Sequence, residues 1–154
     1  MAHLKLKANS CTDMFSPSRE EVREFFVQAW RKHRQNDILT PLESQALGWM
    51  VQHPEYQPDL ESDEALTRDY SVEEGRTNPF LHLSMHLAIT EQVSIDQPRG
   101  IKAAYDTLSA KVDRHFAAHE IMECLGQVVW ESQRSGTALN SDSYLELIQR
   151  RAGL

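Results

Sequence analysis

The segment at residues 78–94 limits the fold of this chain more than any other part of the sequence. It opens with Asn78 and Pro79, an N-cap residue followed by a proline that is tolerated in the first helical turn. Apolar residues then occur on nearly every face of the predicted helix: Phe80, Leu81, Leu83, Met85, Leu87, Ala88, Ile89 and Val93. A helix that is apolar nearly all round is usually buried among other helices. We therefore expect an all-α fold built around this segment.

Helical signals recur along the rest of the chain, and strand signals are scarce. Thr40-Pro41-Leu42-Glu43 is a capping box with a proline at the first helical position. Apolar periodicity and capping residues predict further helices at residues 16–33, 40–52, 101–110, 113–133 and 143–151, with short helical turns between 53 and 77. The expected fold is a single-domain helical bundle of about five main helices over residues 14–154, preceded by a flexible N-terminal arm at 1–13.

Composition excludes several classes of function. The formal net charge is −7, whereas binding to nucleic-acid phosphates needs a concentrated basic surface. The sequence contains no apolar run long enough to span a membrane. Cys11 and Cys124 have neither metal-binding nor redox spacing, and they suggest no disulfide framework. We expect a cytoplasmic protein that binds neither nucleic acid nor membrane, and a homo-oligomer or a protein partner stays open.

Two of the predicted helices each carry a pair of histidines four residues apart. His82 and His86 lie in the first, and His115 and His119 lie in the second, where Glu123 follows after four more residues. Residues at this spacing share one helix face and are separated by about 6 Å along the axis, so two imidazoles can reach one ion. If consecutive helices run up and down, the two helices are parallel and both pairs lie at the same level. The spacing therefore predicts a metal site formed by these four histidines and Glu123.

Two interpretations of these histidines remain open. In the first, the protein binds a divalent transition metal; imidazole and carboxylate ligands suit zinc, iron, copper, nickel or cobalt, and we expect zinc or iron first. In the second, it is a non-enzymatic helical interaction or assembly protein with structural histidines. Four buried imidazoles with a carboxylate in register favour the metal, because each unsatisfied one costs about 1–3 kcal/mol. The sequence identifies no catalytic residue, and whether the protein is an enzyme stays open. If the protein is an enzyme, two kinds of chemistry are open. A metal-bound water could react with Glu120 or Glu123 as the proton acceptor, or an iron ion could carry out oxygen chemistry.

Three further residues carry expectations about local structure. His33 is expected to stabilise the C-terminal end of its helix. His53 precedes Pro54 and is expected at the surface, where it would serve as a control in mutagenesis. Gly126 lies inside a predicted helix at a cost of about 1 kcal/mol relative to alanine, which suggests the close approach of a neighbouring backbone.

Several segments of the chain resemble a bacterial family called "domain of unknown function 1841". The resemblance runs through residues 14–19, 25–30, 40–43, 53–56, 75–82, 94–98 and 119–126. It covers nearly everything from Met14 onward, and residues 1–13 fall outside it. The resemblance implies a cytoplasmic, single-domain bacterial protein. It implies no particular activity, so the metal-site hypothesis depends on the histidine spacing alone.

Overall fold

The computed structural model describes residues 18–70 and 78–154, and these residues form helices without any strand. The predicted all-α class is confirmed for this part of the chain. The predicted arm at 1–13 lies outside the described residues. The described chain divides into two compact units, Met1–Ser84 and Met85–Leu154, and the boundary falls within helix α4. A single bundle of about five main helices is therefore not confirmed, and the single domain over 14–154 stays a prediction.

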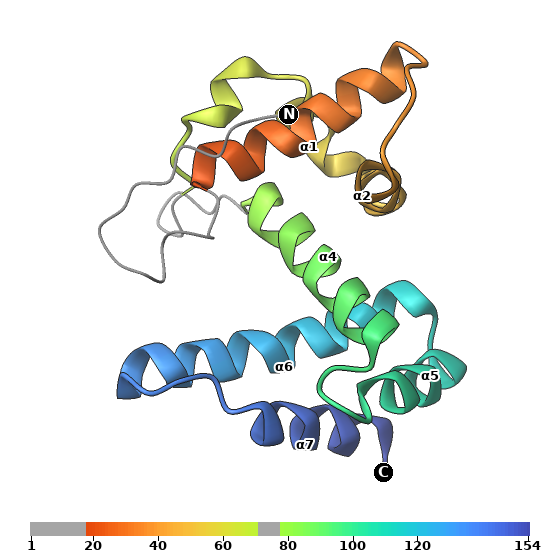
Figure 1. Cartoon of the computed structure of the whole chain (residues 1–154), viewed down its shortest axis with the longest axis vertical. Coiled ribbons are helices and arrows are strands. Elements are labelled where there is room, and N and C mark those ends of the chain that lie inside the picture. The colour runs from red at the N-terminus through yellow and green to blue at the C-terminus, as the bar shows by residue number, and fades with distance from the viewer. Residues whose placement is uncertain (1–17, 71–77) are drawn as a thin grey trace. The chain divides into compact units, whose positions relative to one another are not determined.

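The first unit contains two longer helices and a series of short ones (Figure 1). In chain order they are α1 (Arg19–Arg34), α2 (Pro41–Val51), the 3₁₀ turn η2 (Pro54–Tyr56), α3 (Gln57–Leu60), the 3₁₀ turn η3 (Asp63–Leu66) and the start of α4 (Pro79–Ile95). The predicted helical turns between 53 and 77 thus occur as η2, α3 and η3 where the structure describes that stretch.

Side-chain caps determine where these helices begin. The expected start at Ser16 and Pro17 lies outside the described residues, and α1 begins instead after Ser18, whose side chain accepts the Glu21 N–H at 3.1 Å. At α2 the predicted capping box is confirmed. Thr40 Oγ1 accepts the Glu43 N–H at 3.2 Å, and the Glu43 carboxylate accepts the Thr40 N–H at 2.9 Å. Each cap provides partners for N–H groups that have none within the helix itself.

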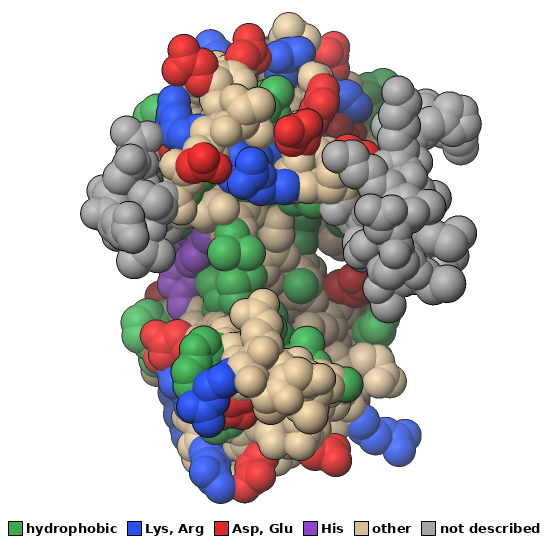
Figure 2. Space-filling model, turned by 90° about the vertical axis from the view of Figure 1, so that its left-hand side faces the viewer, with side chains coloured by type: hydrophobic (Ala, Val, Ile, Leu, Met, Phe, Trp, Pro, Cys, Tyr) green, Lys and Arg blue, Asp and Glu red, His purple; other side chains and the backbone are tan. Residues whose placement is uncertain are grey.

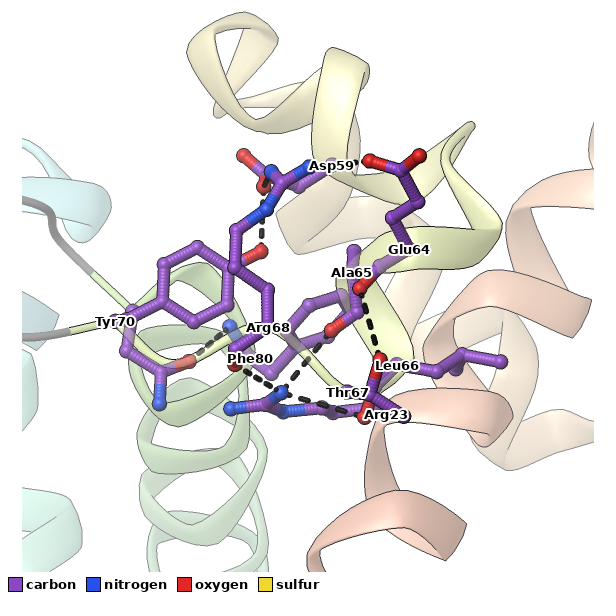
Figure 3. A network of polar contacts seen from close by, with 10 residues as sticks. Arg23, Asp59, Glu64, Ala65, Leu66, Thr67, Arg68, Tyr70 and Phe80 are labelled. Carbon is purple, nitrogen blue, oxygen red and sulfur yellow. Dashed lines mark hydrogen bonds and ion pairs between the residues drawn. The ribbon is translucent and has the colours of Figure 1, made fainter.

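A buried arginine of α1 joins that helix to η3 and to the residues that follow η3. Only 2% of Arg23 is exposed, and its Nη1 donates to the carbonyls of Ala65, Leu66 and Arg68 at 3.0, 3.3 and 2.7 Å. Its guanidinium carbon lies 5.2 Å from the ring centroid of Tyr70 and 5.5 Å from that of Phe80 (Figure 3). The cation therefore replaces its water shell with carbonyl oxygens and aromatic faces.

The second unit consists of the later part of α4, with α5 (Ile101–Lys111), α6 (Arg114–Ser135) and α7 (Ser141–Ala152). Helices α5, α6 and α7 pack against one another, as Figure 1 also shows. Each contributes to one buried core: Ile89, Ile101, Ala104, Leu108, Ala117, Ile121, Met122, Cys124, Val128, Tyr144, Ile148 and Ala152. Tyr144 also donates its hydroxyl hydrogen to the Gln92 side-chain oxygen at 2.6 Å, which ties α7 to α4.

The long helix α6 begins and ends where the sequence predicts. The Asp113 side chain accepts the Phe116 N–H at its start, and Gly136 ends it with a positive φ of 70°. The expected close approach at Gly126 is wrong. A Cβ built on that glycine would meet no atom within 4 Å, so open space rather than a neighbouring backbone surrounds the position.

Charged side chains of both signs are interspersed over each unit on the face shown in Figure 2. Among the described residues, no helix is both long enough and apolar enough to span a membrane.

Candidate metal centre

Three histidine side chains meet in the second unit, one from α4 and two from α6. His119 Nε2 lies 3.1 Å from His86 Nε2 and 3.0 Å from His115 Nε2. The His86 ring also lies near the His115 ring, with centroids 5.4 Å apart. We call His86, His115 and His119 the imidazole triad. It joins two segments that are separated by about thirty residues of sequence.

Local structure explains how these three side chains come together. His86 is fully buried, and α4 places it one turn before Ile89, which belongs to the core of the second unit. The Asp113 cap fixes the start of α6, so His115 and His119 fall in its first two turns on one face. Both are half-buried, and the neighbouring Ala117 and Ala118 are buried in the core. The small alanine side chains let α6 lie close to its neighbours.

Hydrogen bonding alone does not account for the convergence on one nitrogen. A neutral imidazole nitrogen carries either one hydrogen or one lone pair. His119 Nε2 therefore makes one good hydrogen bond, yet two other Nε2 atoms lie within 3.1 Å of it. Imidazole nitrogens are also donors that suit a transition-metal ion.

The distances also fit a shared ion. With ligand bonds of about 2.0–2.1 Å and tetrahedral angles, two nitrogens on one zinc ion are about 3.3 Å apart. The observed separations of 3.0 and 3.1 Å are shorter by only a few tenths of an ångström. Each of these two pairs of nitrogens is therefore close to the separation expected for ligands of one ion.

The carboxylates near the triad have another partner. Arg151 Nη1 donates to Glu120 Oε2 and to Glu123 Oε2, both at 2.6 Å, and 67% of the Glu123 side chain is exposed. These two hydrogen bonds raise the pKa of the Arg151 guanidinium further above its ordinary value. That Glu123 is a ligand, and that Glu120 accepts a proton at the site, both stay predictions.

Two more histidines contact each other in the first unit. His82 Nε2, from the start of α4, lies 3.1 Å from His53 Nε2. His53 is 3% exposed, so the expectation that it is a surface residue is wrong. These two histidines, like His86 and His119 in the second unit, each offer one imidazole nitrogen to a metal ion.

The position of His53 follows from the end of α2. Pro54 disfavours helical backbone at the preceding residue, and His53 adopts φ −125° and ψ 68°. Its ring turns back over the last turn of α2, where Nδ1 lies 2.7 Å from the Trp49 carbonyl oxygen. That carbonyl also accepts the Gln52 N–H, at 3.2 Å, at the end of α2. Spacing arguments miss His53 because it and His82 are far apart in sequence, and the sequence signal is only a histidine between a helix end and a proline.

Two other expectations can be compared with the structure. His33 lies in the last turn of α1 and is exposed, in agreement with its predicted place at the end of that helix. Cys124 is 1% exposed, and burial raises the pKa of its thiol. A buried, protonated thiol is a poor nucleophile, so Cys124 acts as a small core residue.

Over the part of the chain that the structure describes, fold and site define an all-helical protein with buried or half-buried histidines on α4, on α6 and after the end of α2. Residues 18–150 match the family model described as "Domain of unknown function (DUF1841)", and the chain belongs to this family. Among curated proteins and among solved structures, no match to the chain was found.

Proposed function

We propose that this protein binds a divalent transition metal through the imidazole triad of its second unit. The observation that carries the proposal is the convergence on His119 Nε2, which has two other histidine nitrogens at 3.0 and 3.1 Å. One imidazole nitrogen cannot satisfy both neighbours by hydrogen bonding, whereas one ion can bind all three nitrogens.

The chemistry of the donors limits the metal. Neutral imidazoles suit zinc, iron, copper, nickel and cobalt, whereas calcium and magnesium prefer oxygen ligands. We propose zinc or iron. Three protein ligands leave a further position on the ion, and an open position of that kind is where a metal activates water.

Two members of the predicted ligand set need separate tests. His82 precedes His86 by one helical turn in sequence, and Glu123 follows His119 by one turn. Their spacing motivates both as ligands, and the ion pair with Arg151 gives the Glu123 carboxylate a competing partner. A cytoplasmic location also belongs to this proposal, and net charge and the absence of a disulfide framework motivate it.

The metal content of protein purified without an affinity tag or chelator tests the proposal. We expect about one equivalent of zinc or iron per chain, detected by inductively coupled plasma mass spectrometry, and its loss in His119→Ala. The alternative is a helical interaction or assembly protein whose histidines are structural. Metal-free protein whose melting temperature does not change when zinc or iron is added would favour that alternative.

A further inference from the structure

The pair His53 and His82 in the first unit has the features of a pair of metal ligands. We propose that these two imidazoles are ligands of a divalent transition metal, and that His53 is held in advance in the tautomer that ligation requires. This inference deepens the proposed function and rests on it, since both need the chain to bind a transition metal. It adds a residue that spacing in the sequence does not predict.

The contact with Trp49 fixes the hydrogen on the His53 ring. A carbonyl oxygen only accepts hydrogen bonds, so the 2.7 Å contact means that His53 Nδ1 carries the hydrogen and donates it. In the neutral ring, Nε2 then carries the lone pair. Histidine ligands of metals commonly donate their other ring N–H to a backbone carbonyl in this way. The Trp49 carbonyl therefore orients the ring and leaves Nε2 ready to bind a cation.

Packing holds the His53 ring in place. Tyr56 stacks on it with centroids 5.1 Å apart and planes 3° apart, and His53 is 3% exposed. The Tyr56 ring also meets the His82 ring edge-on, with centroids 5.7 Å apart. Tyr56 therefore acts as a positioning residue that packs against both imidazole rings.

The second ligand comes from α4. Asn78 caps that helix by accepting the Phe80 and Leu81 N–H groups at 3.1 Å, which fixes its first turn and hence His82. His82 Nε2 lies 3.1 Å from His53 Nε2, close to the separation of about 3.3 Å expected for two nitrogens on one ion. The pair supplies two imidazole nitrogens, and water or other donors complete the coordination.

A simple hydrogen bond is the competing explanation of the same distance. A hydrogen on His82 Nε2 can be donated to the lone pair of His53 Nε2, and such a pair would need no metal. The two explanations differ in what they predict for one substitution. In His53→Asn, the side-chain amide can still donate to the Trp49 carbonyl, because the asparagine nitrogen occupies the place of Nδ1. The variant keeps the contact at the end of α2, and it loses Nε2 together with the part of the ring that stacks on Tyr56.

The test is a zinc titration of the full chain in competition with a chromophoric chelator. It compares wild type, His53→Asn, His119→Ala and the matched control His33→Asn, which makes the same change at an exposed histidine. We expect His53→Asn to lower zinc affinity at least about tenfold or to lower the stoichiometry, with wild-type binding in His33→Asn.

The outcomes separate this inference from the proposed function. If wild type binds zinc, His119→Ala loses it and His53→Asn binds like wild type, the inference is overturned and the proposed function stands. If wild type binds no zinc, cobalt or iron, both fail. If His53→Asn does not fold without metal, ¹⁵N-labelled wild type replaces it. The His53 Nε2 resonance should then shift when zinc is added, and an unchanged resonance overturns the inference.

Discussion

His86 Nε2 on α4 lies 3.1 Å from His119 Nε2 on α6, although the two residues are 33 positions apart in the sequence. His86 is fully buried and His119 is half-buried. Burial of a polar group is costly unless the group finds a partner, so this contact stabilises the fold whether or not a metal is bound. The two nitrogens are also close enough to each other to bind one ion.

His119→Ala should remove the metal and destabilise the protein. The substitution removes the nitrogen on which His86 and His115 converge and leaves a buried His86 without that contact. Thermal melting of metal-loaded protein, with and without chelator, measures both effects. We expect chelator to lower the wild-type melting temperature and to leave that of the variant unchanged.

The control for this experiment is His33→Ala, at an exposed position on α1. His53 cannot serve as that control because it is buried. If chelator has no effect on wild type and His119→Ala melts like His33→Ala, the imidazole triad is neither a metal site nor a structural requirement.

Glu123→Gln separates the predicted ligand role of Glu123 from its ion pair. The substitution weakens the contact with Arg151, which is partly exposed and keeps Glu120 as a partner. We expect a loss of stability below about 1 kcal/mol in urea unfolding, because exposed ion pairs contribute little. Zinc titration of the same variant completes the test, since a tenfold weaker affinity would make Glu123 the ligand that its spacing predicts.

Arg23→Met should destabilise the first unit by about 2–4 kcal/mol. Methionine fills much of the space beside Tyr70 and Phe80 but cannot donate to the three carbonyls that Arg23 Nη1 contacts. Buried acceptors that lose their donor carry most of the cost. Urea unfolding followed by circular dichroism measures the change. A variant as stable as wild type would mean that these carbonyls accept hydrogen bonds from water in place of Arg23.

Gly126→Ala should stabilise the protein by about 0.5–1 kcal/mol. The position lies inside α6, and an added Cβ meets nothing within 4 Å, so alanine gains helix propensity without a clash. Gly136→Ala is the matched control on the same helix. Its φ of +70° strains any residue with a Cβ, and we expect a loss of about 1–2 kcal/mol. If the two substitutions change the free energy of unfolding in urea equally, the contrast between open space at Gly126 and a positive φ at Gly136 is wrong.

Glu43 should make the stability of the first unit depend on pH. The hydrogen bond from the Thr40 N–H, together with Lys32 at 3.0 Å, lowers the pKa of this carboxyl below its ordinary value, despite its burial. A group with a lowered folded pKa stabilises the protein above its unfolded pKa, and this contribution is lost as pH falls through the folded pKa. We expect Glu43→Gln to reduce the slope of unfolding free energy between about pH 5 and pH 3. If the slope is the same in wild type and variant, Glu43 is not the source of the pH dependence.

The helices themselves could be read from the sequence because the signals that define them are local. The capping box at Thr40 and Glu43 is confirmed, and it acts within about one helical turn, as do the Asp113 cap and the Gly136 stop of α6. The all-α class follows from these signals and from apolar periodicity. The pairing of His115 with His119 is local for the same reason, because residues four apart share a helix face.

Contacts between distant segments required the tertiary structure. No local pattern indicates that His53 is buried against His82. The hydrogen bonds from Arg151 to the carboxylates of Glu120 and Glu123, and the division of the chain within α4, are equally invisible in the local sequence. The sequence alone determined which residues are helical and which histidines share a helix face, since helix formation depends on neighbours within a few positions. Only the tertiary structure decided which histidines and carboxylates meet, because packing of apolar faces sets the distances between segments far apart in the chain.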